Sequence, residues 1–206
     1  MGKPLRCAAI LAGGKSSRMG SDKALLPVGG ISMLERAVRV AAAQRLGVIV
    51  VGRTAPPHGW PEEFKAVRFI PDGGEAFAGP IAGLLTALEI CNAPLLLLGC
   101  DMPLLTGRTL RGLLAAHEAA PDAIATMAVS RGDDGSLYAE PTLSIYTPAM
   151  LPRLKEMMQS GRRSFQPLLR ENCVARWEIP PESASEVLNV NDAETLAQAD
   201  QILRAP

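Results

Sequence analysis

The sequence predicts an α/β fold with three layers, in which a mostly parallel sheet is covered by helices on both faces. Apolar runs of strand length alternate along the chain with longer segments of helical periodicity, which is typical of this architecture. Several of these runs are apolar throughout, as strands buried on both faces are. The chain has 206 residues, of which 48% are hydrophobic, enough to fill one core. We therefore expect a single domain over residues 1–206.

Eight segments have the length and composition of strands. The predicted strands are 7–11, 48–51, 67–70, 95–98, 124–129, 142–146, 174–179 and 188–190. No internal repeat or low-complexity linker interrupts this pattern, and we interpret the proline-rich stretch 54–61 as a surface loop.

Helix signals lie between these strands. Ser32 and Glu35 have capping-box spacing ahead of a segment rich in Ala and Val, which predicts a helix that begins there. Gly79-Pro80 places a proline where the first turn of a helix tolerates it, ahead of a predicted helix at 81–90. Three more helices are expected at 106–120, 148–158 and 192–203.

The charges and the hydropathy exclude two classes of partner. The chain has 21 Lys and Arg residues against 21 Asp and Glu residues, and its basic residues are scattered, so we expect no broad surface for nucleic acid or for an anionic membrane. No apolar stretch approaches the ~20 residues of a membrane helix, and the N-terminus lacks the pattern of a secretory signal. Any charge that binds phosphate must therefore be local.

The four cysteines, Cys7, Cys91, Cys100 and Cys173, are widely spaced. They form no CxxC pair, and the two histidines of the chain offer few further zinc ligands. We interpret these cysteines as reduced thiols of a cytoplasmic protein.

The most informative segment is the glycine-rich turn that follows the first predicted strand. It reads LAGGKSSRMGSDK from Leu11 to Lys23. At the carboxyl end of a parallel strand, the backbone N–H groups of such a turn can approach phosphate without a Cβ in the way. Arg18 and Lys23 add two cations to the same segment, so we expect it to bind the phosphates of a nucleotide.

Two better-known phosphate loops do not match this segment. A Walker A loop requires G-x-x-x-x-G-K-[ST], and Gly14-Lys15-Ser16 fits its end, but the first glycine would fall at Ala9, inside the strand. A dinucleotide fingerprint requires G-x-G-x-x-G, and Gly13-Gly14 has the wrong spacing. The remaining pattern, L-A-G-G-x-S-x-R-M-G-x-D-K, resembles the signature of sugar-nucleotide and cofactor nucleotidyltransferases.

A carboxylate follows a second apolar strand, at Gly99-Cys100-Asp101. If this strand runs parallel to the first, Asp101 lies at the same edge of the sheet as the glycine-rich turn. Mg²⁺ prefers one or two carboxylates together with phosphate oxygens and water, so Asp101 is the predicted metal ligand and Mg²⁺ the predicted cofactor. The alternative is a turn or cap residue before the helix at 106–120.

Further residues could complete this edge of the sheet. Asp72 follows the predicted strand at 67–70, and Gly79 precedes a helix whose free N–H groups could meet a base or an anion. Asn189 and Asn191 place two amides on one side of the predicted strand at 188–190, where their carbonyls could complete a metal or phosphate shell. Ordinary loop and turn chemistry is the alternative for both segments.

Taken in order, these motifs resemble those of the molybdenum cofactor guanylyltransferase family. The resemblance covers residues 8–203 and rests on LAGGKSSRMGSDKALL, PDGGEAFAGPIAGLLTAL, GCDMPLL, EPTLSIY, SGRRSF and NVNDAETL. It implies a three-layer Rossmann-like nucleotidyltransferase fold, GTP and molybdopterin-bound molybdenum as substrates, and Mg²⁺ as cofactor.

The resemblance also implies roles for single residues. Lys23 would contact the phosphates, Asp72 the nucleoside and Asp101 the metal. The residues expected around the nucleotide are Leu11, Ala12, Gly13, Gly14, Lys23, Gly52, Asp72, Gly79 and Asp101. The candidates for the pterin side, or for support of the site, are Arg162, Arg163, Asn189 and Asn191.

The chain departs from the family pattern at two positions. Gly52 stands where a family member used for comparison has an asparagine, which leaves the contacts to base or ribose open. Glu140 stands where that protein has a histidine before the proline, which leaves the pterin side open.

The implied reaction is attack by the terminal phosphate of molybdopterin on the α-phosphorus of GTP, with release of pyrophosphate. Because the nucleophile is already anionic, no Ser/His or Cys/His dyad is required. Catalysis would consist of positioning and charge stabilisation, with Arg18 and Lys23 on the pyrophosphate and Asp101 holding Mg²⁺.

Two other functions remain open at this point. A cytidylyltransferase acting on the same pterin, or another small nucleotidyltransferase, would use the same loop and metal. A carrier module would hold the molybdenum cofactor without any reaction. As partners we expect transient contacts with molybdoenzymes or cofactor-insertion proteins, and neither nucleic acid nor a membrane.

Overall fold

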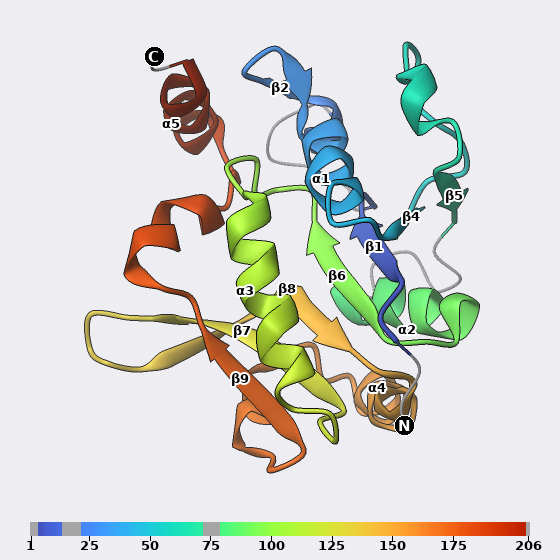
Figure 1. The fold of residues 1–206 in the computed structure, drawn as a ribbon, viewed down its shortest axis with the longest axis vertical. Coiled ribbons are helices and arrows are strands. Elements are labelled where there is room, and N and C mark those ends of the chain that lie inside the picture. The colour runs from blue at the N-terminus through green and yellow to red at the C-terminus, as the bar shows by residue number, and fades with distance from the viewer. Residues whose placement is uncertain (1–3, 14–21, 72–78, 205–206) are drawn as a thin grey trace.

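The computed structural model describes residues 4–13, 22–71 and 79–204, and a seven-stranded sheet forms its centre (Figure 1). The strands lie in the order β5-β4-β1-β6-β8-β7-β9. Their bounds are Cys7–Leu11 for β1, Gly47–Val51 for β4, Arg68–Ile70 for β5, Leu95–Gly99 for β6, Ala125–Arg131 for β7, Leu137–Tyr146 for β8 and Val174–Glu178 for β9. A separate hairpin is formed by β2 (Pro27–Val28) and β3 (Ile31–Ser32).

Most neighbouring strands of the sheet run parallel. The strands β5, β4, β1 and β6 are parallel to one another, and β7 is parallel to β9. Only β8 is antiparallel, to both of its neighbours, β6 and β7. The prediction of a mostly parallel sheet is therefore confirmed.

Helices cover both faces of this sheet (Figure 1). The α-helices are α1 (Met33–Ala42), α2 (Pro80–Cys91), α3 (Gly107–Glu118), α4 (Leu151–Gln159) and α5 (Ala193–Arg204). Buried side chains of α1 and α3 pack on one face, and those of α2 and α4 pack on the other. Helix α5 packs beside the β2–β3 hairpin in a small third cluster. The predicted three-layer α/β architecture is thus confirmed.

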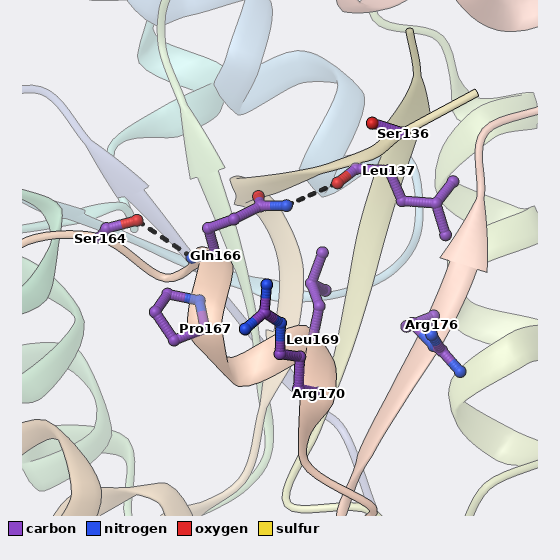
Figure 2. A pocket seen from close by; sticks show the side chains of 8 residues that line it. All are labelled: Ser136, Leu137, Ser164, Gln166, Pro167, Leu169, Arg170 and Arg176. Atoms are coloured by element: carbon purple, nitrogen blue, oxygen red, sulfur yellow. Dashed lines mark hydrogen bonds between the residues drawn. The ribbon is translucent and has the colours of Figure 1, made fainter. Parts of the chain in front are cut away.

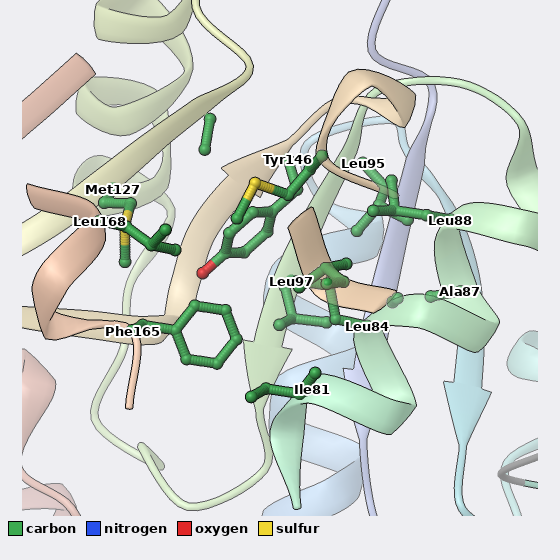
Figure 3. Packing of buried hydrophobic residues seen from close by; sticks show 14 of the residues in the cluster. Ile81, Leu84, Ala87, Leu88, Leu95, Leu97, Met127, Tyr146, Phe165 and Leu168 are labelled. Atoms are coloured by element: carbon green, nitrogen blue, oxygen red, sulfur yellow. The ribbon is translucent and has the colours of Figure 1, made fainter. Parts of the chain in front are cut away.

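The alternation of side chains along the strands supplies both cores. In β1, Ala9 faces α2 and α4, whereas Ala8 and Ile10 face α1 and α3. Figure 3 shows the first of these cores, in which Tyr146 of β8 lies against Phe165 with ring centroids 5.9 Å apart. Because strands of this kind are buried on both faces, they read as continuous apolar runs in the sequence.

The predicted helix starts agree with the structure. The Ser32 hydroxyl accepts a hydrogen bond from the Glu35 N–H at 3.2 Å and caps α1. Pro80 is the first residue of α2, and Gly79 before it has a φ of +67°, a conformation that favours glycine. The expected helix at 148–158 is divided, because its first residues form a 3₁₀ turn, η3 (Pro148–Met150), ahead of α4.

Three details of the prediction were wrong. The segment 188–190 is not a strand, because no strand pairs with it among the described residues; Val190 N donates to Asp101 O, beyond the end of β6, at 2.8 Å. The strand expected at 142–146 begins earlier, as β8, because residues 137–139 pair with β7 across an irregularity. The short β2–β3 hairpin has too few residues to show a strand pattern.

The cysteines and the helix lengths are two further features of the structure. All four cysteines are free, and the Sγ atoms of Cys7 and Cys91 lie 2.9 Å apart. Over the described ranges, every helix is too short or too polar to cross a bilayer.

Candidate functional site

The carboxyl ends of three parallel strands form one edge of the sheet. Leu11 of β1 lies beside Val51 of β4 on one side and beside Gly99 of β6 on the other. The segments that follow these residues therefore leave the sheet together, which satisfies the condition under which Asp101 was expected near the glycine-rich turn. This is the edge at which open α/β sheets bind ligands.

The turn after β1 lies directly against the end of β4. Gly52 has a φ of +96°, and a Cβ at this position would lie 2.4 Å from Gly13 Cα and 2.5 Å from Gly13 N. The Ala12 N–H donates to Val51 O at 2.9 Å, which closes the contact between the two strand ends. A Cβ at position 52 would require the backbone of Gly13 to shift, so the ends of the two strands are in backbone-to-backbone contact here.

Leu11 extends this contact toward α2. A Cβ on Gly83 would lie 2.6 Å from Leu11 Cδ2, so the second turn of α2 approaches the end of β1 closely. Leu11, Ala12, Gly13 and Gly52 thus lie close together at the strand ends.

Lys23, Asp101 and Asn191 meet at this edge from three distant parts of the sequence. Lys23 begins the 3₁₀ turn η1 (Lys23–Leu25), and its Nζ lies 3.2 Å from Asp101 Oδ2 and 2.8 Å from Asn191 Oδ1. The side chains of Lys23 and Asp101 expose 18% and 30% of their surface, so the pair is partly shielded from water. The bond from Val190 N to Asp101 O holds the segment with Asn191 against this pair.

A second ion pair stands beside the first. Asp22 caps η1, because its Oδ1 accepts from Ala24 N at 3.2 Å, and its Oδ2 pairs with Arg53 Nη2. Arg53 directly follows Gly52, and its side chain is only 16% exposed. Among the described residues, this edge therefore carries two ion pairs, Lys23 with Asp101 and Arg53 with Asp22.

The neighbouring cysteine has no nucleophilic character. Burial raises the pKa of the Cys100 thiol to about 12, and the negative charge of Asp101 acts in the same direction. Only the thiolate is a strong nucleophile, so Cys100 stays protonated near neutral pH and thiol catalysis is not supported here.

Glu140 of β8 is a further carboxylate near Asp101. The Ser130 hydroxyl donates to Glu140 Oε1 at 2.8 Å. Burial raises the pKa of Glu140; the bond from Ser130 opposes this shift, and the charge of Asp101 adds to it. The pairing of β7 with β8 jumps from Met127–Ser144 to Val129–Ala139, so Glu140 lies in a bulge. Bulges re-aim side chains beside active sites, and this one lies just past the pairing of Leu143 with Leu98 of β6.

The remaining predicted residues have different surroundings. Gly79 is exposed at the start of α2. Asn189 donates to Val187 O at 3.5 Å, and Arg162 pairs with Glu156 of α4 at 2.7 Å; neither has a described contact with Lys23, Asp101 or Asn191. Arg163 is exposed in the segment after α4, which ends at Gln159. Gly14, Arg18 and Asp72 lie outside the described residues.

The donor atoms at this edge fit a hard cation. Within the described ranges no three Asp, Glu, His or Cys residues cluster as a complete metal cage. The oxygens present are those of the Asp101 carboxylate and the Asn191 amide, one of each. Mg²⁺ is commonly held by one or two carboxylates with phosphates and water, so this sparse set suits it better than a metal that needs several protein ligands.

A cavity of about 460 Å³ lies elsewhere, between the 3₁₀ turn η4 (Gln166–Arg170) and strands β8 and β9 (Figure 2). Gln166 Nε2 donates to Leu137 O at 2.5 Å, and Gln166 N donates to the Ser164 hydroxyl at 3.2 Å. None of the lining residues belongs to the Lys23–Asp101 pair or contacts it, so the cavity is separate from the edge described above.

Sequence reasoning gave no role to Asp22 or Arg53. Asp22 is part of the glycine-rich signature, directly before Lys23, and its position was the signal available. Arg53 stands in no motif, and only the parallel pairing of β4 with β1 brings it to Asp22.

Comparison with known proteins finds one family along most of the chain. A sequence model of the MobA-like NTP transferase domain matches residues 8–175. A molybdenum cofactor guanylyltransferase of Albidiferax ferrireducens is 33% identical over 205 residues, which cover 96% of this chain and 95% of that protein. One of Bordetella petrii is 33% identical over 196 residues, with 94% of each chain covered.

Solved structures share the fold. The molybdopterin-guanine dinucleotide biosynthesis protein A of Archaeoglobus fulgidus superposes with a TM-score of 0.71 at 23% identity, covering 95% of this chain and 97% of that one. The 2-C-methyl-D-erythritol 4-phosphate cytidylyltransferase of Thermus thermophilus superposes with a TM-score of 0.66 at 18% identity, with both chains fully covered. At these identities the likeness concerns the fold alone.

Proposed function

This chain belongs to the family of MobA-like NTP transferase domains, and on that premise we propose that it transfers GMP from GTP to the terminal phosphate of molybdopterin-bound molybdenum. The products are molybdopterin guanine dinucleotide and pyrophosphate. The observation that carries the proposal is the meeting of Lys23, Asp101 and Asn191 at the carboxyl edge of the sheet, in a chain whose relatives are named for this reaction.

The chemistry requires positioning rather than a protein nucleophile. A terminal phosphate oxygen of molybdopterin bonds to the α-phosphorus of GTP, and the bond from that phosphorus to the oxygen that bridges the α- and β-phosphates breaks. The electron pair of the broken bond leaves with pyrophosphate. Because the nucleophile is already an anion, the reaction requires no thiolate from the protein, and burial raises the pKa of the Cys100 thiol beside the site.

Among the residues that the structure describes, Lys23 is the cation that we assign to the phosphates. Its ammonium group has three N–H donors, of which Asp101 and Asn191 accept two, so a third remains for a phosphate oxygen. Arg18 adds a second cation from the glycine-rich turn. Together they offset the charge that accumulates on pyrophosphate, and each such contact contributes a factor on the order of 10²–10³ in rate.

Asp101 would hold the divalent metal, which we propose is Mg²⁺. When bound there, the metal would supply neutralisation of the phosphate charge. Asn191 orients Lys23 next to the Asp101 carboxylate, so that the Lys23 ammonium would meet the triphosphate and the Asp101 carboxylate would meet the metal.

The remaining assignments concern the two substrates. Around the nucleotide we place Leu11, Ala12, Gly13, Gly14, Gly52, Asp72 and Gly79. We expect backbone groups of the first turn and the turn that contains Asp72 to recognise the guanine edge, and the part of the chain from 72 to 78 lies outside the described residues. On the pterin side, or in support of the site, we place Arg162, Arg163, Asn189 and Asn191.

The test is an assay for pyrophosphate with purified protein, Mg²⁺ and loaded cofactor, run with GTP and with CTP. We expect pyrophosphate to be released, and GTP to be preferred by roughly 10²-fold in kcat/KM, because cytosine would leave buried polar groups of a guanine pocket unpaired. Equal use of both nucleotides, or preference for CTP, would overturn the guanylyl assignment. Binding of the cofactor without pyrophosphate would indicate a carrier.

We place the reaction in the cytoplasm, where reduced thiols such as the four free cysteines persist. Transient contacts with molybdoenzymes or cofactor-insertion proteins would deliver the product.

A further inference from the structure

Arg53 lies at the nucleotide edge without a role in the reaction described above. It follows the end of β4, and the close contact of Gly52 with Gly13 fixes the backbone from which its side chain leaves. Its guanidinium group binds Asp22, so it joins the end of β4 to the residue that directly precedes Lys23.

The ion pair acts on the segment that presents Lys23. Asp22 uses one oxygen to cap η1, whose first residue is Lys23, and the other oxygen to bind Arg53. The capped turn and the ion pair therefore share one carboxylate. If the Arg53 side chain is removed, the Asp22 carboxylate loses the ion pair that orients it. The cap of η1, the turn that begins at Lys23, is then held less firmly.

Arg53 also keeps a donor unused. The Nε atom of Arg53 is buried and has no hydrogen-bond partner. Among the described residues, no other buried side-chain nitrogen or oxygen lacks one. A buried N–H without an acceptor is destabilising, and such groups in proteins call for a specific explanation such as a ligand. A guanidinium group offers donors in a fixed planar fork, so one edge can bind a carboxylate and still present an N–H to a second oxygen.

We propose that Arg53 is a positioning residue for the polyphosphate of the nucleoside triphosphate. Through Asp22 it holds the turn that presents Lys23, and its Nε–H donates to an oxygen of the bound polyphosphate. This inference rests on the proposed function, because it assumes that the edge binds a nucleoside triphosphate.

The test measures the affinities of the full-length protein for GTP and GMP, each with Mg²⁺ and without acceptor, by titration calorimetry. The variants are Arg53→Gln, Asp22→Asn and the double variant, and Arg68→Gln is the matched control because Arg68 begins the neighbouring strand β5 at its opposite end. Asp22→Asn keeps an oxygen that can cap Ala24 N but loses the charge that binds Arg53.

We expect Arg53→Gln to weaken GTP binding by about tenfold or more, since a hydrogen bond to a charged group is typically of this size. Affinity for GMP should change much less, because GMP lacks the β- and γ-phosphates that Lys23 and Arg53 serve. Asp22→Asn should also weaken GTP binding. The double variant should lose less GTP affinity than the product of the two single losses, because both substitutions break the same ion pair. Arg68→Gln should bind as the wild type does.

Three results would overturn the inference. GTP affinity of Arg53→Gln equal to that of the wild type would remove Arg53 from the site. Equal losses for GTP and GMP, with a lowered melting temperature, would mean that Arg53 only supports the fold. A wild-type chain that binds neither nucleotide would overturn the proposed function itself, and the inference with it.

Discussion

Gly52 illustrates how a single residue shapes the candidate site. Its φ of +96° is a conformation that L side chains rarely adopt, and any Cβ would meet the backbone of Gly13. The departure from the asparagine of the compared family member therefore has a local reason in this chain: the ends of β1 and β4 approach each other too closely for a side chain.

We predict that Gly52→Ala lowers the free energy of unfolding by about 2 kcal/mol or more, because it adds a strained φ to a clash with backbone atoms that cannot move cheaply. Urea unfolding measures this loss. Gly47→Ala in the same strand is the control, since a Cβ there would meet only Arg6 O at 3.5 Å, an ordinary contact. Equal stability of the two variants would show that the two strand ends can separate without loss.

In the proposed mechanism Asp101 would bind the metal. Substitution of Asp101 should therefore change activity without a comparable change in stability. Asp101→Asn keeps nearly the same volume and can still accept from Lys23, but a neutral amide is a weaker ligand for Mg²⁺. We expect kcat/KM for GTP to fall by about 10²–10³ while the melting temperature changes little. Asp122→Asn, in an exposed turn after α3, serves as the control. Turnover near that of the wild type at saturating Mg²⁺ would contradict the role of Asp101.

The bulge in β8 could not be predicted from the alternation of apolar and polar residues along the strand. It brings Glu140 into a half-buried position where the carboxyl group is partly removed from water and faces the charge of Asp101. A regular ladder would instead alternate the side chains of 140 to 143 between the two faces. The irregular pairing lies beside the candidate site, and bulges in such places commonly redirect a side chain toward the site.

The pKa of Glu140 gives a prediction about pH. Burial raises this pKa in the folded state, so the folded protein binds the proton more tightly than the unfolded chain does. Its contribution to stability is then fully present below the ordinary glutamate pKa of about 4.3 and is lost as the pH rises through the higher pKa of the folded state. Glu140→Gln is neutral at every pH and its side-chain oxygen can still accept from Ser130. We therefore expect this variant to be more stable than the wild type at pH 8, with a difference that vanishes near pH 4.

Urea unfolding of wild type and variant at the two pH values measures that difference. Glu182→Gln, at an exposed position with no described hydrogen bond, is the control and should show no such dependence on pH. A Glu140→Gln variant that is less stable than the wild type at pH 8 would mean that the carboxylate has a stabilising partner outside the described residues.

For the whole molecule, the sheet order has a consequence for cooperativity. Strands β5 and β9 lie at opposite edges of one sheet, and they are connected through five strands that share two cores. The two tryptophans of the chain report on these two ends. Trp60 lies against Phe69 of β5 with ring centroids 5.4 Å apart, and Trp177 belongs to β9, close to Gly112 of α3.

We propose that the chain is a single domain, and we predict that both ends unfold together. The variants Trp60→Phe and Trp177→Phe each leave one fluorescent tryptophan, and each should give a single urea transition whose midpoint matches the midpoint of the far-UV circular dichroism of the same variant. A midpoint that differs between the two probes of one variant would mean that the two edges unfold as separate units.

The sequence by itself determined the α/β class, the order of most elements and the segments that contribute to the site. These inferences depend on local physics: buried parallel strands are apolar throughout, helix caps have fixed spacing, and glycine-rich turns follow strands where phosphate binds. The resemblance carried by the same segments led to the family that the comparisons later showed. Lys23 and Asp101 were found in this way because each belongs to a recognisable motif.

Only the tertiary structure decided which of these side chains meet. Strand register brings Gly52 against Gly13, the antiparallel β8 and its bulge bring Glu140 toward Asp101, and the segment after 187 reaches Asp101 without being a strand. Arg53 gave no signal in the sequence, because its contact with Asp22 joins residues 31 positions apart. Contacts of this kind depend on the relative placement of elements, which the pairing of the strands fixes and which no local pattern contains.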